Sequence, residues 1–144
     1  MKALIKAIKT QLQTSLTTIR NSDIFVTEDE RLIPSSVKFP AAGIKDGPIA
    51  YEMHTNIQEK HELDVKIIIY VQLHKPEASI MGDTSTTQLG VLDLTATVYT
   101  ALKNNFLSGQ ADIAWPVSET ESELLADDDT AIQMKIITMR YTRL

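Results

Sequence analysis

The sequence predicts an α+β protein in which two helices pack on one face of a mostly antiparallel β-sheet. The stretch Leu63–His74 carries apolar residues at every second position, which is typical of a strand. Residues 1–20 and 86–106 carry them at every third and fourth position, which is typical of amphipathic helices. The expected strands come in neighbouring pairs, and this argues against a doubly wound nucleotide fold.

The central strand is the clearest element. One face of it is apolar throughout, with Leu63, Val65, Ile67, Ile69, Val71 and Leu73. The opposite face is apolar only in the middle, at Ile68 and Tyr70. We therefore expect an interior strand that is covered fully on one side, with a helix across part of its back.

The first helix is expected from Met1 to about Arg20. Its apolar stripe consists of Leu4, Ile5, Ile8, Leu12, Leu16 and Ile19. Three lysines accompany the stripe, which leaves a membrane-surface helix as an alternative. The sheet needs a cover, so packing on the sheet is favoured.

A short strand, Ile24–Val26, and a polar loop should follow this helix. Val37, Phe39 and Ala41 then alternate, and Pro40 indicates an edge strand because proline donates no backbone hydrogen bond.

Gly43–Pro48 contains an Asp-Gly pair, which predicts a hairpin turn. Ile49–His54 would be the return strand, with Ile49, Tyr51 and Met53 sharing one face. Asn56–Glu62 is polar and is expected to be a loop that leads into the central strand.

After an irregular stretch at residues 77–87, the second helix should run from about Thr86 to Phe106. Its expected stripe is Leu89, Leu92, Ala96, Tyr99, Leu102 and Phe106, widened by Val91, Leu94 and Val98. Such a broad apolar surface belongs against a sheet or between layers. Asp93 should lie at the margin of the stripe and reach water.

The C-terminal region predicts a projecting acidic β-hairpin. Ala111, Ile113, Trp115 and Val117 alternate, and three glutamates then continue on the same face. Unpaired carboxylates cannot be buried, so the strand must leave the globule near Ser118 or twist that face into solvent.

The turn is expected near Asp127, and residues 131–144 should return as a strand, which would place Lys135 opposite Glu119. Ile132, Met134 and Ile136 would share one face of the return strand, with Ile137, Met139 and Tyr141 on the other. The candidate interaction residues are Glu119, Glu121, Glu123, Asp127, Asp128 and Asp129.

Composition narrows the possible functions. The 144 residues fit one domain, residues 1–144, with 43% hydrophobic and 23% charged residues. The net charge of -5 argues against a protein that grips nucleic acid. Cysteine is absent, so disulfides and thiolate metal sites are excluded. We expect no signal peptide and no membrane span.

No catalytic, cofactor or metal site is expected. The chain has no glycine-rich phosphate loop and no nucleophile elbow. His54, His61 and His74 lack the spacing of a helical metal site. Asp127–Asp129 could hold a hard cation, but no ligand loop with a closing glutamate follows. We therefore predict that the protein is not an enzyme.

Three features together resemble the tail terminator and minor tail proteins of long-tailed bacteriophages. They are the leading amphipathic helix, the stretch Phe39–Gly47, and a long strand followed by Gly90–Leu94 within the second helix. The order of elements covers nearly the whole chain. Neighbouring tail-completion and head–tail joining proteins share this layout.

This resemblance implies a structural protein of the virion tail–neck region that is made in the host cytoplasm. Such proteins form rings, commonly hexameric, that cap the tail tube protein and stop its polymerisation. The ring offers a joining surface to a head-completion or connector protein, and DNA passes through without specific binding. The family supplies no catalytic residues, and the acidic hairpin tip has no fixed family counterpart.

Two alternatives stay open on the sequence. One is another component of a tail-like assembly, such as a tube, neck or baseplate protein. The other is a small-ligand-binding domain with a pocket between sheet and helices. Such a pocket needs polar groups on an apolar wall, and the expected inward faces offer only tyrosines such as Tyr51, Tyr70 and Tyr99.

Overall fold

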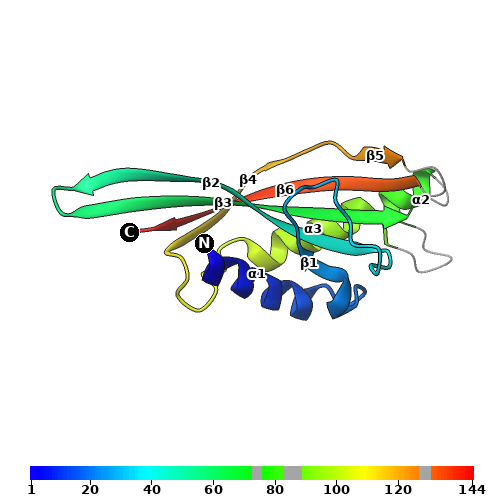
Figure 1. Ribbon diagram of the computed structural model, residues 1–144, viewed down its shortest axis with the longest axis horizontal. Helices are drawn as coiled ribbons and strands as arrows, with labels where there is room; N and C mark the ends of the chain where they lie inside the picture. Colours follow the sequence, from blue (N-terminus) through cyan, green and yellow to red (C-terminus); the bar gives the residue numbers. More distant parts are fainter. Residues whose placement is uncertain (73–75, 83–88, 127–130) are drawn as a thin grey trace.

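A computed structural model describes residues 1–72, 76–82, 89–126 and 131–144 of the chain. A six-stranded sheet carries the strands in the order β1-β2-β3-β6-β4, and β5 also pairs with β6 (Figure 1). Among the described strands only the β1–β2 pair is parallel, so the predicted α+β class with a mostly antiparallel sheet is confirmed. The strands are β1 (Ile24–Val26), β2 (Ala41–Thr55), β3 (Gln58–Gln72), β4 (Ile113–Glu119), β5 (Glu123–Ala126) and β6 (Ala131–Arg143). The helices are α1 (Lys2–Ser15), α2 (Pro76–Met81) and α3 (Val91–Leu102).

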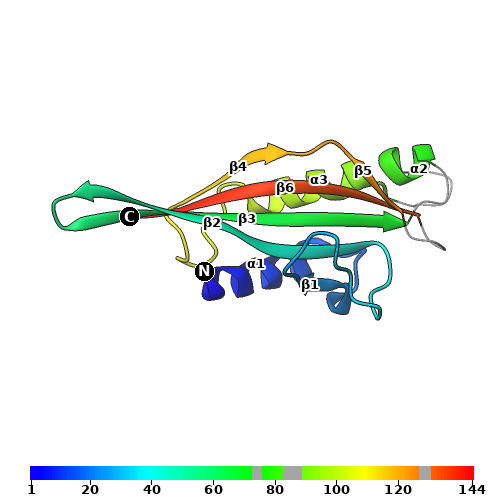
Figure 2. The same ribbon diagram turned by 45° about the horizontal axis from the view of Figure 1, so that its top comes forward.

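The main core lies between the sheet and two helices. Helices α1 and α3 lie on the same side of the sheet in both views (Figures 1 and 2). Strand β3 runs between β2 and β6, as predicted for the central strand. Its helix-covered face buries Leu63, Val65, Ile67, Ile69 and Val71. Leu73 and His74 lie outside the described residues.

A loop, rather than a helix, covers the other face of the central strand. Ile68 and Tyr70 pack there with Phe25, and loop residues such as Val37 and Phe39 close over them. Tyr70 donates a hydrogen bond of 2.5 Å to the backbone carbonyl of Glu30 in that loop. The expectation of a helix on this face was therefore wrong, because residues 27–40 fold back as an irregular cover.

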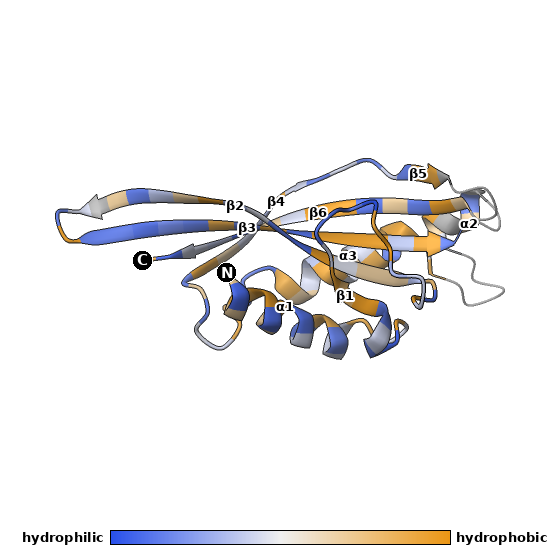
Figure 3. Cartoon of the chain, in the orientation of Figure 1, coloured by the Kyte–Doolittle hydropathy of each residue, from blue (hydrophilic) through white to orange (hydrophobic). Residues whose placement is uncertain are grey.

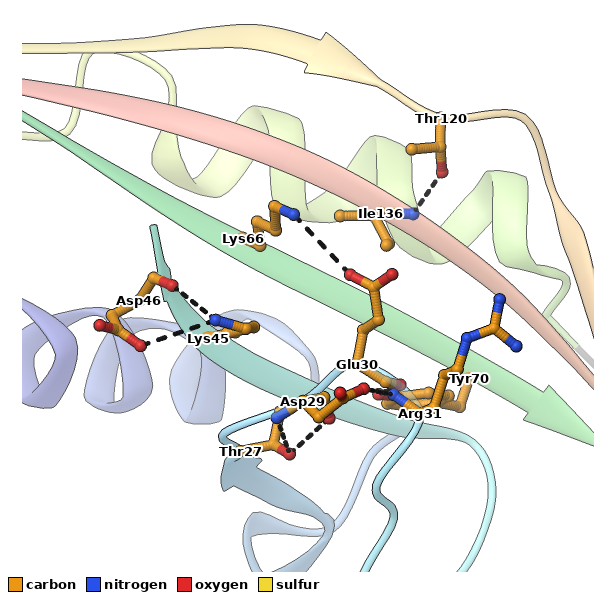
Figure 4. A network of polar contacts seen from close by, with 10 residues as sticks. All are labelled: Thr27, Asp29, Glu30, Arg31, Lys45, Asp46, Lys66, Tyr70, Thr120 and Ile136. Carbon is orange, nitrogen blue, oxygen red and sulfur yellow. Dashed lines mark hydrogen bonds and ion pairs between the residues drawn. The ribbon is translucent and has the colours of Figure 1, made fainter. Parts of the chain in front are cut away.

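The same loop is fastened to the sheet by polar contacts (Figure 4). The Glu30 carboxylate lies 3.8 Å from the ammonium of Lys66 on β3. Just before β1, Arg20 donates two hydrogen bonds to the buried carboxylate of Asp23, at 2.7 and 2.9 Å. Asp23 also accepts the backbone N–H of Lys38 at 3.1 Å. These contacts let an irregular segment serve as a stable layer.

The first hairpin differs from the prediction. The Asp46-Gly47 pair makes no turn, because β2 runs without a break from Ala41 to Thr55. It marks instead a register shift between Asp46 and Ile49, as a β-bulge produces. The chain reverses at residues 56–57, so the predicted loop over Asn56–Glu62 is mostly strand. The predicted edge strand around Val37 is also wrong, since β2 begins only at Ala41.

Both helices are shorter than predicted. Helix α1 ends at Ser15, yet Leu16 and Ile19 are still buried in the chain that follows. Helix α3 buries Val91, Leu94, Thr95, Val98 and Leu102. Of the expected main stripe on this helix, Leu92 and Tyr99 are exposed, so its phase was wrong. The residues predicted only to widen the stripe form the core face, because α3 packs against both α1 and the sheet.

Two smaller outcomes concern the region around α3. The predicted irregular stretch contains a short helix, α2, and residues 83–88 lie outside the described part of the chain. Asp93 is exposed, as predicted, and its carboxylate accepts the Gly90 N–H at 3.1 Å at the start of α3. A helix N-terminus favours such a carboxylate. Among the described residues, no helix has the length and apolar character needed to cross a membrane.

Strand β6 agrees with the prediction. Ile132, Met134 and Ile136 face the loop-covered cluster, whereas Ile137, Met139 and Tyr141 face the helices. Apolar residues fall on both faces of β6 because the strand is buried on both sides for much of its length.

Candidate assembly surfaces

No enzyme-like or metal site stands out in the described residues. Within residues 1–72, 76–82, 89–126 and 131–144, no group of three histidine or acidic side chains could hold a metal ion. The space between sheet and helices is filled by buried apolar side chains. Two open hollows lie elsewhere, one beside the loop at residues 26–34 and one at the turn between β2 and β3. The surfaces that distinguish this molecule are therefore exposed apolar ones.

The first such surface is the β2–β3 arm, which we define as residues 47–63. It extends past the ends of α1 and α3, and its outer part, residues 52–60, is a two-stranded ribbon (Figures 1 and 2). Strand β6 pairs with β3 only as far as His61, opposite Arg143. Beyond that point β3 pairs with β2 alone. An isolated two-stranded hairpin is marginally stable in water, so an arm of this kind is suited to a partner surface.

One face of the arm carries large apolar side chains that remain exposed, beside His61 and Glu59. Ile49, Tyr51 and Met53 share the face that farther along the sheet is covered by the helices, since Ile49 pairs with the buried Leu63. Tyr51 is 66% exposed and Met53 75% exposed, and Ile57 at the turn is 95% exposed. The Tyr51 ring meets the His61 ring edge-on at 4.8 Å. The apolar pattern of the core thus continues where nothing lies over it.

The other face of the arm is charged. The Lys60 ammonium lies 3.4 Å from Glu52 and 3.0 Å from Glu62, and hydrogen bonds to these two carboxylates raise the pKa of Lys60. Most of the β3 half of the arm is coloured hydrophilic in Figure 3. The arm is therefore amphipathic, with a solvated face and a face suited to burial.

The second exposed apolar surface follows the edge strand β4. Ile113, Trp115 and Val117 are about half exposed, whereas Ala114 is fully buried opposite Tyr141. The prediction that the odd-numbered residues face the core was thus wrong beyond Ala111. Ala114 belongs to the helix-covered core, so Ile113 and Trp115 lie on the opposite face of β4, which in the described residues is an edge strand paired with β6.

A cation completes this surface. The Lys103 ammonium lies 4.7 Å from the centre of the Trp115 ring and 5.0 Å from that of Tyr99, and it donates a hydrogen bond to the Tyr99 hydroxyl at 2.9 Å. In the part of the chain that the structure describes, no carboxylate lies in ion-pair range of Lys103. We call Tyr99, Lys103, Ile113, Trp115 and Val117 the β4 surface.

The predicted acidic residues lie farther along the same edge. Glu119, Glu121 and Glu123 are exposed, and Glu123 lies 3.8 Å from Arg31. A register shift lies between Pro116 and Ser118, close to where the sequence predicted a change, but Glu119 and Glu123 still pair with β6. Asp127, Asp128 and Asp129 lie outside the described residues. The hairpin that extends farthest from the helices is the β2–β3 arm (Figure 1).

The predicted pairing of Lys135 with Glu119 is wrong. Glu119 lies opposite Ile137 instead, and the Lys135 ammonium donates a hydrogen bond of 2.5 Å to the Thr120 carbonyl. The Thr120 hydroxyl accepts the Ile136 N–H at 3.0 Å (Figure 4). The acidic segment is therefore held along β6 by backbone and hydroxyl contacts, which leaves its carboxylates free to face solvent.

The comparisons with known proteins give one informative result. No protein-family model matches the sequence, and no curated protein matches it. The fold is similar to that of a chain in the solved virion of a native gene transfer agent (GTA) particle, with a TM-score of 0.52 and 12% sequence identity. The match covers 96% of this chain and 93% of the other. At this identity the match establishes a shared fold over nearly the full length of both chains.

Proposed function

We propose that this chain is a structural protein of a phage-like virion. The observation that carries the proposal is the fold shared with a virion chain over nearly all of both sequences. Exposed apolar surfaces on the arm and along β4 also support it, because large uncovered apolar patches on a folded chain mark interaction sites. In the described residues the space between sheet and helices is packed with apolar side chains, which gives a small-ligand-binding role no comparable support.

Within the virion, the proposed role is that of a tail terminator. Copies would form a ring, commonly a hexamer, that caps the tail tube, stops its polymerisation and offers a joining surface to the head-completion protein. A ring needs two different surfaces on each copy. This chain carries two, the apolar face of the arm and the β4 surface. The register shift at Pro116 also discourages open-ended extension of the sheet along the β4 edge.

The acidic segment from Glu119 to Asp129 is proposed to face the lumen of the ring or an adjoining ring. Carboxylates on the wall of a DNA passage repel phosphates and keep DNA from adhering. Its test is the replacement of Asp127, Asp128 and Asp129 with alanine in a particle-producing genome. Unchanged assembly and infectivity would reject this role and leave a solvated surface hairpin.

Deletion of the gene tests the tail-terminator role. Negative-stain images of the resulting particles should show tails of uncontrolled length that are not joined to heads, and expression from a plasmid should restore normal particles. Tails of normal length joined to heads would contradict the role. Missing tails would point to a tube or baseplate component instead, and absence of the chain from purified particles by mass spectrometry would reject a virion protein altogether.

A further inference from the structure

We propose that the β2–β3 arm of one copy seats its apolar face on the β4 surface of the next copy. Tyr51 and Met53 would pack against Trp115, and Glu59 would pair with Lys103. This inference deepens the proposed function, because it rests on the chain assembling with itself and names the contact between copies.

The exposed apolar side chains of the arm are not covered by any described segment of the same chain. Its face with Ile49, Tyr51 and Met53 continues the helix-covered face of the sheet, but α1 and α3 do not extend over it (Figure 1). Burial of apolar area stabilises by about 25 cal/mol per Å², so an amphipathic ribbon gains most from a partner that is itself apolar. The β4 surface is such a partner, with Ile113, Trp115 and Val117 exposed on a rim.

Charge complementarity selects the β4 surface over a second arm. The arm contains three glutamates and one lysine, and that lysine is already held by Glu52 and Glu62 on the charged face. Glu59 pairs across the ribbon with Met53, so its carboxylate lies on the same face as Met53; it is 71% exposed and 3.0 Å from the His61 ring nitrogen. On the β4 surface, Lys103 is a cation held between two aromatic rings. Contact between two arms would bring like charges together.

Symmetry leads to the same choice. An arm-to-arm contact uses the same patch on both copies and closes at a dimer. An arm seated on the β4 surface uses two different patches, so each copy both gives an arm and receives one. Such a contact can continue around a ring, as the proposed function requires.

Cross-linking between introduced cysteines tests the contact. The chain has no native cysteine, so only the introduced ones can react. Two strains are made, each co-expressing two variants that carry one cysteine apiece: Met53→Cys with Trp115→Cys, and Met53→Cys with Thr10→Cys on the exposed side of α1. Particles purified from each strain are treated with a short bismaleimide. The first pair should give a cross-linked product carrying both cysteines, and the control pair should not. Particles that contain the chain without that product, or with equal product in both strains, would overturn the inference.

A charge exchange provides the second test. Glu59→Lys or Lys103→Glu alone should lower the yield of complete particles about tenfold, which corresponds to about 1.4 kcal/mol in total. The double variant should restore most of that yield. Both side chains lie on the surface, and unchanged thermal unfolding of each purified variant would show that folding is intact. Single variants with normal yield would overturn the inference, whereas particles lacking even the wild-type chain would instead reject the proposed function.

Discussion

Strands β2 and β3 run through two different environments, the body of the sheet and the arm. Comparing the two shows that the residue pattern that forms a strand does not decide whether its apolar face is buried. In the body of the sheet, Ile67 and Ile69 have no exposed surface because α1 and α3 lie over them. In the arm, Tyr51 and Met53 continue the same face and remain mostly exposed. Alternation predicts a strand in both halves. Only the reach of the helices decides which half is core and which half is available for assembly.

The largest expected effect comes from removing core volume in the body. Ile67→Ala should lower the free energy of unfolding by about 3–4 kcal/mol, because it leaves a cavity beneath the helices. Met53→Ala, on the corresponding face of the arm, should change it by less than about 0.5 kcal/mol. Denaturant unfolding of the two purified variants measures both values, and equal losses would break the comparison.

The junction between body and arm should be next in sensitivity. A β-carbon on Gly47 would lie 2.7 Å from the backbone carbonyl oxygen of Asp64, which cannot move without disturbing the β2–β3 pairing. Gly47→Ala should therefore lower the free energy of unfolding by about 2 kcal/mol. Ala50→Ser, at an exposed position three residues farther along, is the matched control and should be nearly neutral. A neutral Gly47→Ala would show that the junction is more adaptable than the contact implies.

A smaller, pH-dependent effect is expected where the loop cover is fastened to the body. Hydrogen bonds from Arg20 hold the pKa of Asp23 below its ordinary value of 3.8. Because the folded-state pKa is the lower one, the stabilisation is present above about pH 4 and is lost as the pH falls through the folded-state pKa. Asp23→Asn should thus lower the free energy of unfolding by about 1–2 kcal/mol at pH 7.

The difference between wild type and Asp23→Asn should shrink as the unfolding measurements are extended below pH 4. Asp46→Asn, at an exposed carboxylate on β2, is the matched control variant and is measured over the same pH range. A difference that stays constant down to pH 2 would mean that the charge of Asp23 does not fasten the loop.

The smallest effect should be found at the tip of the arm. Ile57→Ser should change the free energy of unfolding by less than about 0.5 kcal/mol, because this side chain is almost fully exposed. It should nevertheless shorten retention of the purified protein on a hydrophobic-interaction column. A clear loss of stability would show that the tip packs against the body in solution.

Much of the fold could be predicted from the sequence. The alternation in Leu63–Val71 and in Ile132–Tyr141 correctly predicts two strands, and the spacing in Leu4–Leu12 correctly predicts a helix. The secondary structure of these segments is determined by their spacing, because their apolar residues must share a buried face. The exposed acidic residues at Glu119, Glu121 and Glu123 were found for the same reason, since unpaired carboxylates avoid a core.

The apolar surfaces could not be recognised in the same way. Ile49, Tyr51 and Met53 were correctly placed on one face, but the pattern could not show that no helix reaches them. The Asp46-Gly47 pair also suggested a turn that a β-bulge replaces, which hid the length of the arm. Trp115 looked like a core residue because an exposed edge strand and a buried strand share the same alternation.

By itself, the sequence determined the secondary-structure pattern: where side chains must be buried together, local spacing fixes strand or helix. Tertiary structure alone decided which of those apolar faces are covered. Whether the apolar face of β2 and β3 is covered depends on where α1 and α3 end relative to the sheet. The positions of these helices are set by packing between segments that lie far apart in the chain. The arm exists because the helices are shorter than the strands they protect, and the β4 surface exists because Ile113 and Trp115 lie on the face of β4 opposite the helix-covered Ala114.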